Sequence, residues 1–157
     1  MGTKAKKVSE SRTEQVHIIM PGDCNGTERL FGGELMRWID VVAAVVARRH
    51  AGMDVTTAFV DGLEFVAPAH MNETIIIVGC LTYVGRSSME VSLYTYVEAL
   101  DGSRKLVNHA YFIMVAVDEE NNPQQVPGLI LETDEERAEW EAGKCRHRER
   151  KNRRTEA

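Results

Sequence analysis

Closely spaced cysteines are missing from this 157-residue sequence, and so are long uninterrupted apolar runs. Its three cysteines, Cys24, Cys80 and Cys145, are an odd and widely separated set without a CxxC pair. Such spacing supports neither a disulfide framework nor a zinc ribbon, and it fits a reducing compartment. We therefore predict a cytoplasmic protein without a metal site.

Export and membrane signals are also missing. The first residues, MGTKAKKVSESRTEQ, are polar and charged, and no apolar stretch approaches the roughly 18–20 residues that span a bilayer. The net charge of -5 and a pI near 5.6 argue against general polyanion binding, although seven of the nineteen Lys and Arg residues lie within residues 144–154. We expect a soluble protein with no nucleic-acid or membrane partner, and a tail that could attract phosphate locally.

The chain is long enough for one folded core and too short for two. We predict a disordered arm over residues 1–11, one folded domain over residues 12–130, and a charged helix with a basic tail over residues 131–157. Thr133 to Glu136 has the form of a capping box, which marks the start of that helix.

One apolar segment predicts a buried helix from residue 31 to about residue 50. Eleven of the thirteen residues in 35–47 are apolar, and Gly52 is placed to end the helix. Asp40 lies in the middle of this segment. Because an ionised carboxylate in a core is costly unless it is compensated, Asp40 is a candidate functional residue.

Elsewhere the apolar residues recur with a period of two, which is typical of strands. We predict strands over residues 14–20, 55–65, 74–84, 88–98 and 105–117. In the segment 88–98 apolar and polar residues alternate, as in a sheet covered on one face. One strand, one buried helix and then consecutive strands predict an α+β architecture, with an antiparallel sheet wrapped around one long central helix as in the hotdog fold. The exposed edges of such a sheet favour pairing with a second copy.

Four segments carry a resemblance to a known family. In chain order they are MPGDCNGTERLFGGELMRWIDVVAAVVARRH, VTTAFVDGLEFVAP, YVGRSSMEV and HAYFIMVAVDEENNPQQVP. Together they resemble the YciA-like acyl-CoA thioesterases of the hotdog superfamily, a group that includes the brain-type acyl-CoA hydrolases. The resemblance implies hydrolysis of an acyl-CoA to a free acid and coenzyme A, which is part of substrate and product rather than a cofactor. It also implies a homodimer, with a trimer of dimers as a further option.

The resemblance implies that Asp40 is catalytic and that Asn25, from the loop before the helix, partners it across a subunit boundary. Thioester hydrolysis needs an activated water or a nucleophile, together with donors for the oxyanion. We expect apolar surroundings to raise the pKa of Asp40, which would act as a general base or attack directly to form an anhydride. The competing interpretations are an exposed Asp40–Arg37 pair and a turn-forming role for Asn25.

The remaining candidates are expected to contact the substrate. A helix start offers unpaired N–H groups, so the Gly32–Gly33 pair is a candidate oxyanion donor, although a flexible helix entry needs no other role. Phe65 is expected in the core and beside the pantetheine arm. A hairpin segment is expected near the nucleotide, or else forms a solvated turn, and it comprises Gly85, Arg86, Ser87 and Ser88. The basic tail is predicted to be a solvated arm, and the alternative is that it reaches the nucleotide bound by a neighbouring subunit.

The sequence departs from the family pattern at two positions and leaves three competing functions open. Glu28 replaces a usual glycine, which predicts an altered loop path, and Asn72 replaces another glycine at a turn that Asn can maintain. The competing functions are a non-catalytic acyl-CoA sensor, a dehydratase or hydratase using a histidine with a carboxylate, and nucleophilic catalysis by Cys24.

Overall fold

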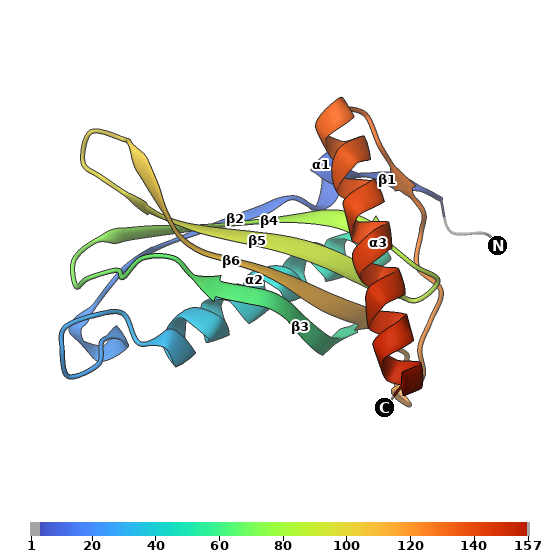
Figure 1. The fold of residues 1–157 in the computed structure, drawn as a ribbon, viewed down its shortest axis with the longest axis horizontal. Coiled ribbons are helices and arrows are strands. Elements are labelled where there is room, and N and C mark those ends of the chain that lie inside the picture. Colours follow the sequence, from blue (N-terminus) through green and yellow to red (C-terminus); the bar gives the residue numbers. More distant parts are fainter. Residues whose placement is uncertain (1–3, 157) are drawn as a thin grey trace.

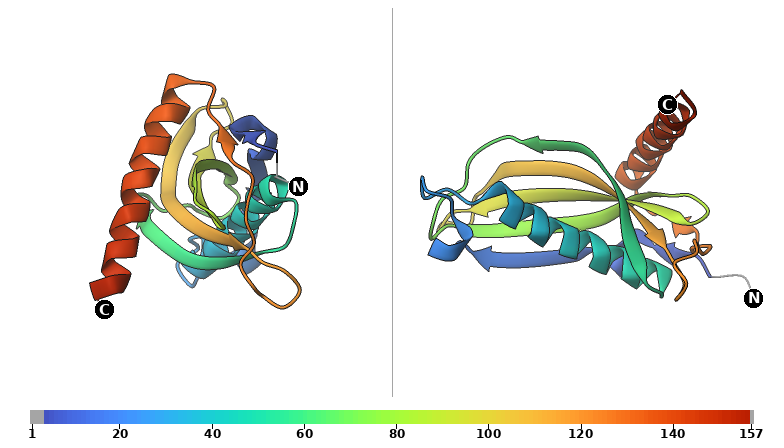
Figure 2. Two further views of the ribbon diagram at one scale, coloured as in Figure 1. Left: turned by 90° about the vertical axis from the view of Figure 1, so that its right-hand side faces the viewer. Right: turned by 90° about the horizontal axis from the view of Figure 1, so that it is seen from below.

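The computed structural model describes residues 4–156, in which a curved antiparallel sheet wraps around one long helix (Figures 1 and 2). The elements in chain order are β1 (Lys6–Lys7), α1 (Val8–Ser11), β2 (Thr13–Ile18), the 3-10 turn η1 (Pro21–Asp23), α2 (Gly32–Ala51), β3 (Val55–Phe65), β4 (Thr74–Val84), β5 (Ser88–Glu98), β6 (Arg104–Ala116), β7 (Leu129–Ile130) and α3 (Asp134–Glu156). The main sheet has five strands in the order β2-β4-β5-β6-β3. The predicted α+β layout is confirmed.

The central helix α2 lies against the concave face of the sheet (Figure 2). Its buried apolar residues recur every three or four positions, so that they form one stripe, and they include Leu35, Ile39, Val42 and Val46. Gly79 of β4 allows the close approach, because a Cβ there would lie 2.9 Å from Val42 Cγ1. The helix ends at Ala51, where Gly52 adopts a left-handed φ of 69°.

Local patterns predicted most strand boundaries correctly. β3, β4 and β5 have the predicted bounds, β6 begins and ends one residue earlier than predicted, and β2 is shorter at its C-terminal end. Asn72 has a φ of 72°, so it maintains the predicted left-handed turn. Glu28 also adopts a left-handed φ, of 59°, a conformation that glycine takes without steric cost.

The second face of the sheet is not open, which corrects the interpretation of residues 88–98. Helix α3 crosses the face opposite α2 (Figure 2), and it buries Glu90 to 2% exposure. Arg146 and Arg150 of α3 bond to that carboxylate. Sequence periodicity did not predict this cover because α3 has no apolar stripe: its contacts include ion pairs to Glu90 and the packing of one aromatic residue, Trp140, on Tyr83.

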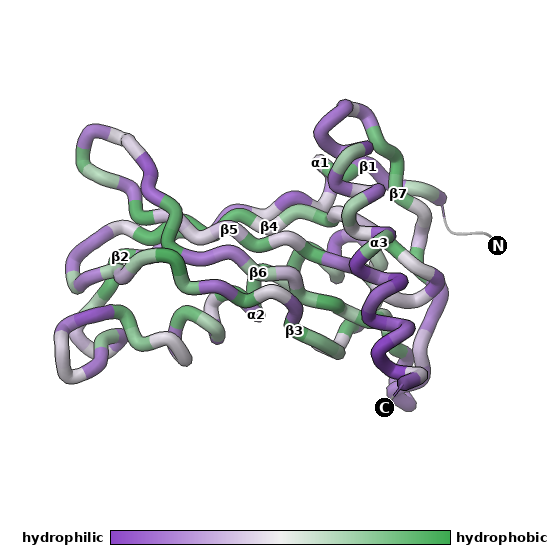
Figure 3. Tube along the Cα trace, viewed as in Figure 1, coloured by the Kyte–Doolittle hydropathy of each residue, from purple (hydrophilic) through white to green (hydrophobic). Residues whose placement is uncertain are grey.

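The predicted disordered arm is also corrected, and the predicted solvated tail is corrected at Arg146 and Arg150, while the other Lys and Arg residues of the tail are exposed. Lys6 and Lys7 pair in parallel with β7, and Val8 of α1 is buried, so residues 4–11 are ordered by long-range contacts; residues 1–3 lie outside the described part. Within the basic tail, Arg150 is 7% exposed and bonds to Asp61. Figure 3 shows α3 as mainly hydrophilic, in keeping with this charged packing. Among residues 4–156, no helix combines the length and apolar character needed to cross a bilayer.

Strand β3 forms one edge of the main sheet and carries exposed apolar side chains. Phe59 is 38% exposed and Phe65 is 52% exposed, so the prediction that Phe65 lies in the core is wrong for the single chain. An unpaired strand edge beside apolar side chains offers both hydrogen bonds and buried area to another strand. This edge is therefore suited to pairing with a further chain.

Candidate functional site

Asp40 lies at the margin of the buried stripe of α2 and faces strand β3. Its side chain is partly buried, and its Oδ1 accepts a 2.6 Å hydrogen bond from Thr57 Oγ1. Thr57 pairs with Met114, a core residue, so its side chain lies on the face of β3 that is turned toward α2. A 2.6 Å hydrogen bond to a carboxylate is of the short, charge-assisted kind. The contact anchors one Asp40 oxygen and leaves the other free to act on a substrate or water.

The predicted alternative for Asp40 is wrong. Arg37 donates to Glu34 instead, with Nη2 2.7 Å and Nε 3.1 Å from Glu34 Oε1. Thr57, by contrast, was missed by the sequence analysis, although it stands in one of the segments that carry the family resemblance. The strand period could have placed it on the helix side of β3, but only the tertiary structure brings it to Asp40.

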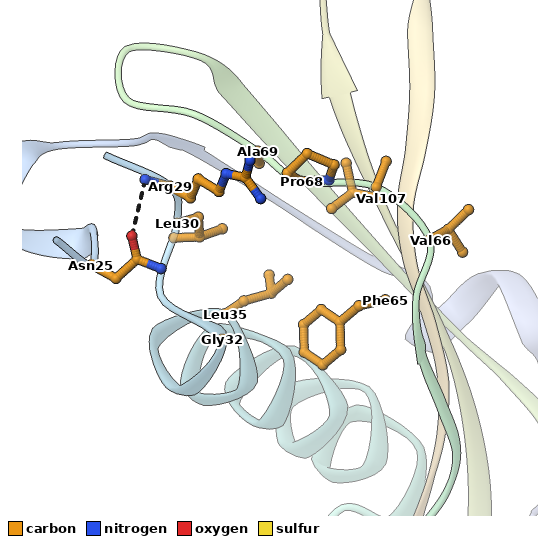
Figure 4. Close-up of a pocket in the computed structure, with 11 residues that line it drawn as sticks. Asn25, Arg29, Leu30, Gly32, Leu35, Phe65, Val66, Pro68, Ala69 and Val107 are labelled. Atoms are coloured by element: carbon orange, nitrogen blue, oxygen red, sulfur yellow. Dashed lines mark hydrogen bonds between the residues drawn. The ribbon is translucent and has the colours of Figure 1, made fainter. Parts of the chain in front are cut away.

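A cavity of about 410 Å³ opens at the N-terminus of α2 (Figure 4). It brings together three of the predicted site residues, Asn25, Gly32 and Phe65. Leu30, Leu35 and Val66 contribute to an apolar wall. The cavity therefore combines an apolar lining with the unpaired amides of a helix start. The lining can enclose an uncharged ligand chain, and the amides can bind a carbonyl oxygen.

Asn25 has a structural role in this loop. Its Oδ1 accepts hydrogen bonds from Thr27 N at 2.9 Å, Thr27 Oγ1 at 2.7 Å and Arg29 N at 3.3 Å. The predicted turn-forming role is thus confirmed for the side-chain oxygen of Asn25. Its amide nitrogen is directed toward the segment that leads into α2 (Figure 4), and among the described residues none accepts a hydrogen bond from it. A donor of this kind remains available to a ligand.

The first turn of α2 supplies backbone donors to the same cavity. Glu34 and Leu35 donate their amides to Phe31 O, at 3.0 and 3.1 Å. Among the described residues, none accepts a hydrogen bond from the amides of Gly32 and Gly33, and of the two glycines only Gly32 lines the cavity. Unpaired amides at the positive end of a helix favour a developing negative charge.

Asp40 and Asn25 do not share a site within one chain. Asp40 lies eight residues beyond Gly32, which corresponds to about 12 Å along an α-helix. The cavity at the helix start is lined by Asn25 and Gly32, whereas Asp40 is not among its lining residues. One chain therefore holds the two halves of the predicted site apart.

The predicted hairpin residues line a second cavity, of about 540 Å³. Gly85, Arg86, Ser87 and Ser88 all contribute to it, and Gly85 N donates to Ser88 O at 2.9 Å to close the turn. The opposite wall of this cavity comes from α3, including Lys151 and Arg154. This wall was not predicted from the sequence, because nothing local in the tail shows that α3 packs beside the hairpin of the same chain.

The histidines and the cysteine that the competing reactions would need make other contacts. His109 lies on the outer sheet face and stacks on Tyr94 with ring centroids 4.2 Å apart, and burial lowers its pKa. His17 stacks on Trp38 of α2 at 4.1 Å. Cys24 donates its thiol to Met20 O at 3.5 Å. Within residues 4–156, no cluster of three or more His, Cys, Asp or Glu side chains could hold a metal ion.

The known sequences that this chain resembles are thioesterases. Residues 28–98 match the family model described as the thioesterase superfamily. The uncharacterized acyl-CoA thioester hydrolase YkhA of Bacillus subtilis is 35% identical over 92% of this chain and 84% of the relative. The cytosolic acyl coenzyme A thioester hydrolase of Mus musculus is 33% identical over 94% of this chain, and the match spans 39% of that longer protein.

Solved structures resemble the whole chain. The crystal structure of an apo hexameric acyl-CoA thioesterase has a TM-score of 0.91 at 35% identity, covering 96% of this chain and 97% of the other. The acyl-CoA hydrolase of Staphylococcus aureus, in complex with butyryl coenzyme A, coenzyme A and coenzyme A disulfide, has a TM-score of 0.90 at 35% identity, covering 97% and 93%. Three variants of that enzyme replace an asparagine, an aspartate and a threonine with alanine, at positions successively 15 and 17 residues apart.

Proposed function

The chain belongs to the acyl-CoA thioester hydrolases of the thioesterase superfamily, and we propose that Asp40 is the group that activates water in its reaction. The protein has the hotdog fold and hydrolyses acyl-CoA to a free carboxylic acid and coenzyme A. The observation that carries the proposal is the 2.6 Å hydrogen bond from Thr57 to one Asp40 oxygen. This bond fixes the carboxylate while its other oxygen accepts a proton.

The variants of the S. aureus enzyme support this choice of residues. Asn25, Asp40 and Thr57 are successively 15 and 17 residues apart, the same separations as the asparagine, aspartate and threonine replaced there. The three residue types and both separations coincide. The set comprises the two predicted catalytic residues and the threonine that holds one of them.

The proposed reaction needs little beyond a base and oxyanion donors. Asp40 takes a proton from water as the new C–O bond forms at the thioester carbonyl. The amide of Gly32 at the start of α2 and the Asn25 side-chain amide face the oxyanion. The C–S bond then breaks, the sulfur leaves readily as a thiolate because a thiol has a pKa of only about 8.5, and the proton held by Asp40 passes to the thiolate, which restores the base. Phe65 and its neighbours enclose the acyl or pantetheine chain.

The proposed active site is shared between two copies of the chain. Asp40 of one copy meets Asn25 and Gly32 of the other, since within one chain Asp40 lies about 12 Å along α2 from Gly32 and outside the cavity that Asn25 and Gly32 line. Pairing of two β3 edges would continue the sheet and cover Phe59 and Phe65, which are exposed in the single chain. A homodimer is therefore the proposed active unit. The hexameric structural relative supports a trimer of such dimers.

The proposed location is the cytoplasm, with acyl-CoA as the partner molecule and a place in lipid metabolism. Three unpaired cysteines fit a reducing compartment, and the mouse relative is named a cytosolic enzyme. Butyryl coenzyme A, bound by the S. aureus relative, is a suitable first substrate.

A thiol-release assay with acyl-CoA tests the assignment of Asp40. Asp40→Asn should lower kcat by about a hundredfold or more, because it removes the proton acceptor while keeping size and shape. The matched control is Asp54→Asn, which neutralises an exposed carboxylate paired with Arg48 on the surface. Thermal unfolding and coenzyme A binding should be unchanged in both variants. A near-normal rate for Asp40→Asn would refute the proposal.

Mixing two inactive variants tests the shared site. In a heterodimer of Asp40→Asn and Asn25→Ala chains, one site carries both substitutions and the other carries neither. Random exchange of subunits should therefore restore about a quarter of the wild-type activity, because half the dimers are mixed and each has one intact site. If the mixture stays as inactive as its components, the two residues do not meet across a subunit boundary.

A further inference from the structure

The cavity between the Gly85–Ser88 turn and helix α3 gathers positive charge. From the turn it receives Arg86 and the hydroxyl residues Ser87 and Ser88. From α3 it receives four side chains one helical turn or less apart, His147, Arg150, Lys151 and Arg154. This concentration stands out in a chain whose net charge is -5. Such a local excess of one sign attracts an oppositely charged ligand.

Helix α3 is fixed firmly enough to form a binding wall. Glu90 accepts hydrogen bonds from Arg146 Nη2 at 2.8 Å and Nε at 3.1 Å, and its Oε2 lies 3.1 Å from Arg150 Nη2. Gly143 lets the helix approach closely, because a Cβ there would lie 2.8 Å from the Cβ of Tyr83. A buried carboxylate bonded to two guanidinium groups holds both the position and the rotation of the helix.

Some cationic side chains of the cavity form ion pairs that hold the fold together, and others have no carboxylate partner. Arg150 is paired, with Nη1 2.9 Å from Asp61 Oδ2. Among the described residues, no carboxylate lies within 4 Å of the cationic groups of Arg86, Lys151 and Arg154. Burial and then the charges of Arg150 and Lys151 lower the pKa of His147, so its ring is neutral at pH 7 and can donate or accept a hydrogen bond.

The cavity lies beside β3, the strand whose Thr57 donates a hydrogen bond to the proposed catalytic carboxylate of Asp40. Ala58 of β3 lines it, and Ala58 follows Thr57, whose hydroxyl bonds to Asp40. Consecutive Cα atoms are about 3.8 Å apart, so the two sites are separated by the thickness of one edge strand. A ligand with anionic groups at one end and a thioester at the other fits this arrangement.

We propose that Lys151 and Arg154 of α3 join Arg86 in binding the phosphate groups of acyl-CoA, and so determine the preference for coenzyme A over shorter thiol carriers. This inference rests on the proposed function. Arg86 and the hairpin lie within the part of the chain that matches the family model, residues 28–98, whereas α3 lies outside it. Helix α3 thus supplies residues that select the substrate and that are separate from the catalytic groups. Guanidinium, ammonium and hydroxyl groups together are suited to phosphate oxygens.

The test compares two thioesters that share one acyl group. Acyl-CoA carries the phosphates, and the acyl-N-acetylcysteamine thioester lacks them. In the full-length double variant Lys151→Gln, Arg154→Gln, KM for acyl-CoA should rise about tenfold or more with kcat unchanged, because two charge-assisted contacts are lost. Hydrolysis of the N-acetylcysteamine thioester should be unaffected. The matched control is Lys144→Gln, Arg148→Gln, which removes the same charge from exposed positions of α3 outside the cavity.

Competition identifies the source of the phosphate. Adenosine 3′,5′-bisphosphate, the nucleotide part of coenzyme A, should inhibit competitively against acyl-CoA in the wild type and much more weakly in the double variant. Inorganic phosphate at the same concentration should inhibit far less; equal inhibition would show a general anion site and overturn the inference. An unchanged KM in the double variant, or an equal rise in the control, would also overturn it. Failure of the proposed function looks different, since the wild type would then hydrolyse neither thioester.

Discussion

The hydrogen bond between Thr57 and Asp40 leads to a quantitative prediction. Thr57→Val keeps the branched shape of the side chain and removes its only donor. Oγ1 lies 2.6 Å from Asp40 Oδ1, which places the bond among those made to a charged acceptor. We expect the carboxylate to lose its fixed orientation, so that fewer of its conformations can accept a proton from water.

The size of the effect follows from the strength of such bonds. Hydrogen bonds to charged groups contribute about 1.5–3 kcal/mol, which corresponds to about a tenfold to 150-fold change in rate. The loss should appear in kcat, with KM for acyl-CoA within about twofold of wild type, because Thr57 orients the base rather than binding the substrate. Thr57 is solvent-exposed on an edge strand, so the thermal unfolding midpoint should change little.

Steady-state thiol release with acyl-CoA provides the measurement, and Thr57→Ser provides the control. Serine restores the hydroxyl without the methyl group, so its kcat should return toward the wild-type value. A purely structural role for Thr57 would predict equal loss in both variants. If Thr57→Val retains kcat within about twofold of wild type, the hydrogen bond does not position the catalytic base and the reasoning fails.

Two further predictions concern stability. Glu28→Gly should raise the unfolding free energy by about 0.5–1 kcal/mol and Tm by about 1–4 °C. Glycine adopts the observed φ of 59° without strain, and this gain exceeds the added entropy of the unfolded chain. A lower Tm in a thermal scan would contradict this account. His50 is fully buried with Nε2 2.8 Å from Pro127 O, and burial lowers its pKa below the unfolded value of about 6.5. The unfolded state therefore binds more protons as the pH falls through about 6.5, so stability should decrease from neutral to mildly acidic pH. In His50→Gln this dependence should be weaker, and an identical pH profile of Tm in the two proteins would exclude a contribution from His50.

Local patterns in the sequence determined much of the framework. Apolar spacing predicted α2 and the bounds of β3, β4 and β5, because a helix or strand buried on one face must repeat its apolar residues with the period of its backbone. The same reasoning identified Asp40 as an unusual residue in an apolar helix. Its catalytic role stays a proposal, as do those of Asn25 and the glycine pair.

Tertiary structure alone decided the contacts between distant segments. The bond from Thr57 to Asp40 joins residues 17 positions apart on a strand and a helix, and the packing of α3 on Glu90 joins residues 56 positions apart. Helix α3 has no apolar stripe from which its position could be predicted. It is held by buried ion pairs to Glu90 and by the packing of Trp140 on Tyr83, and these partners lie far away in the chain. Periodicity reports which face of an element is buried, whereas the partner of a charged side chain depends on how the elements come together.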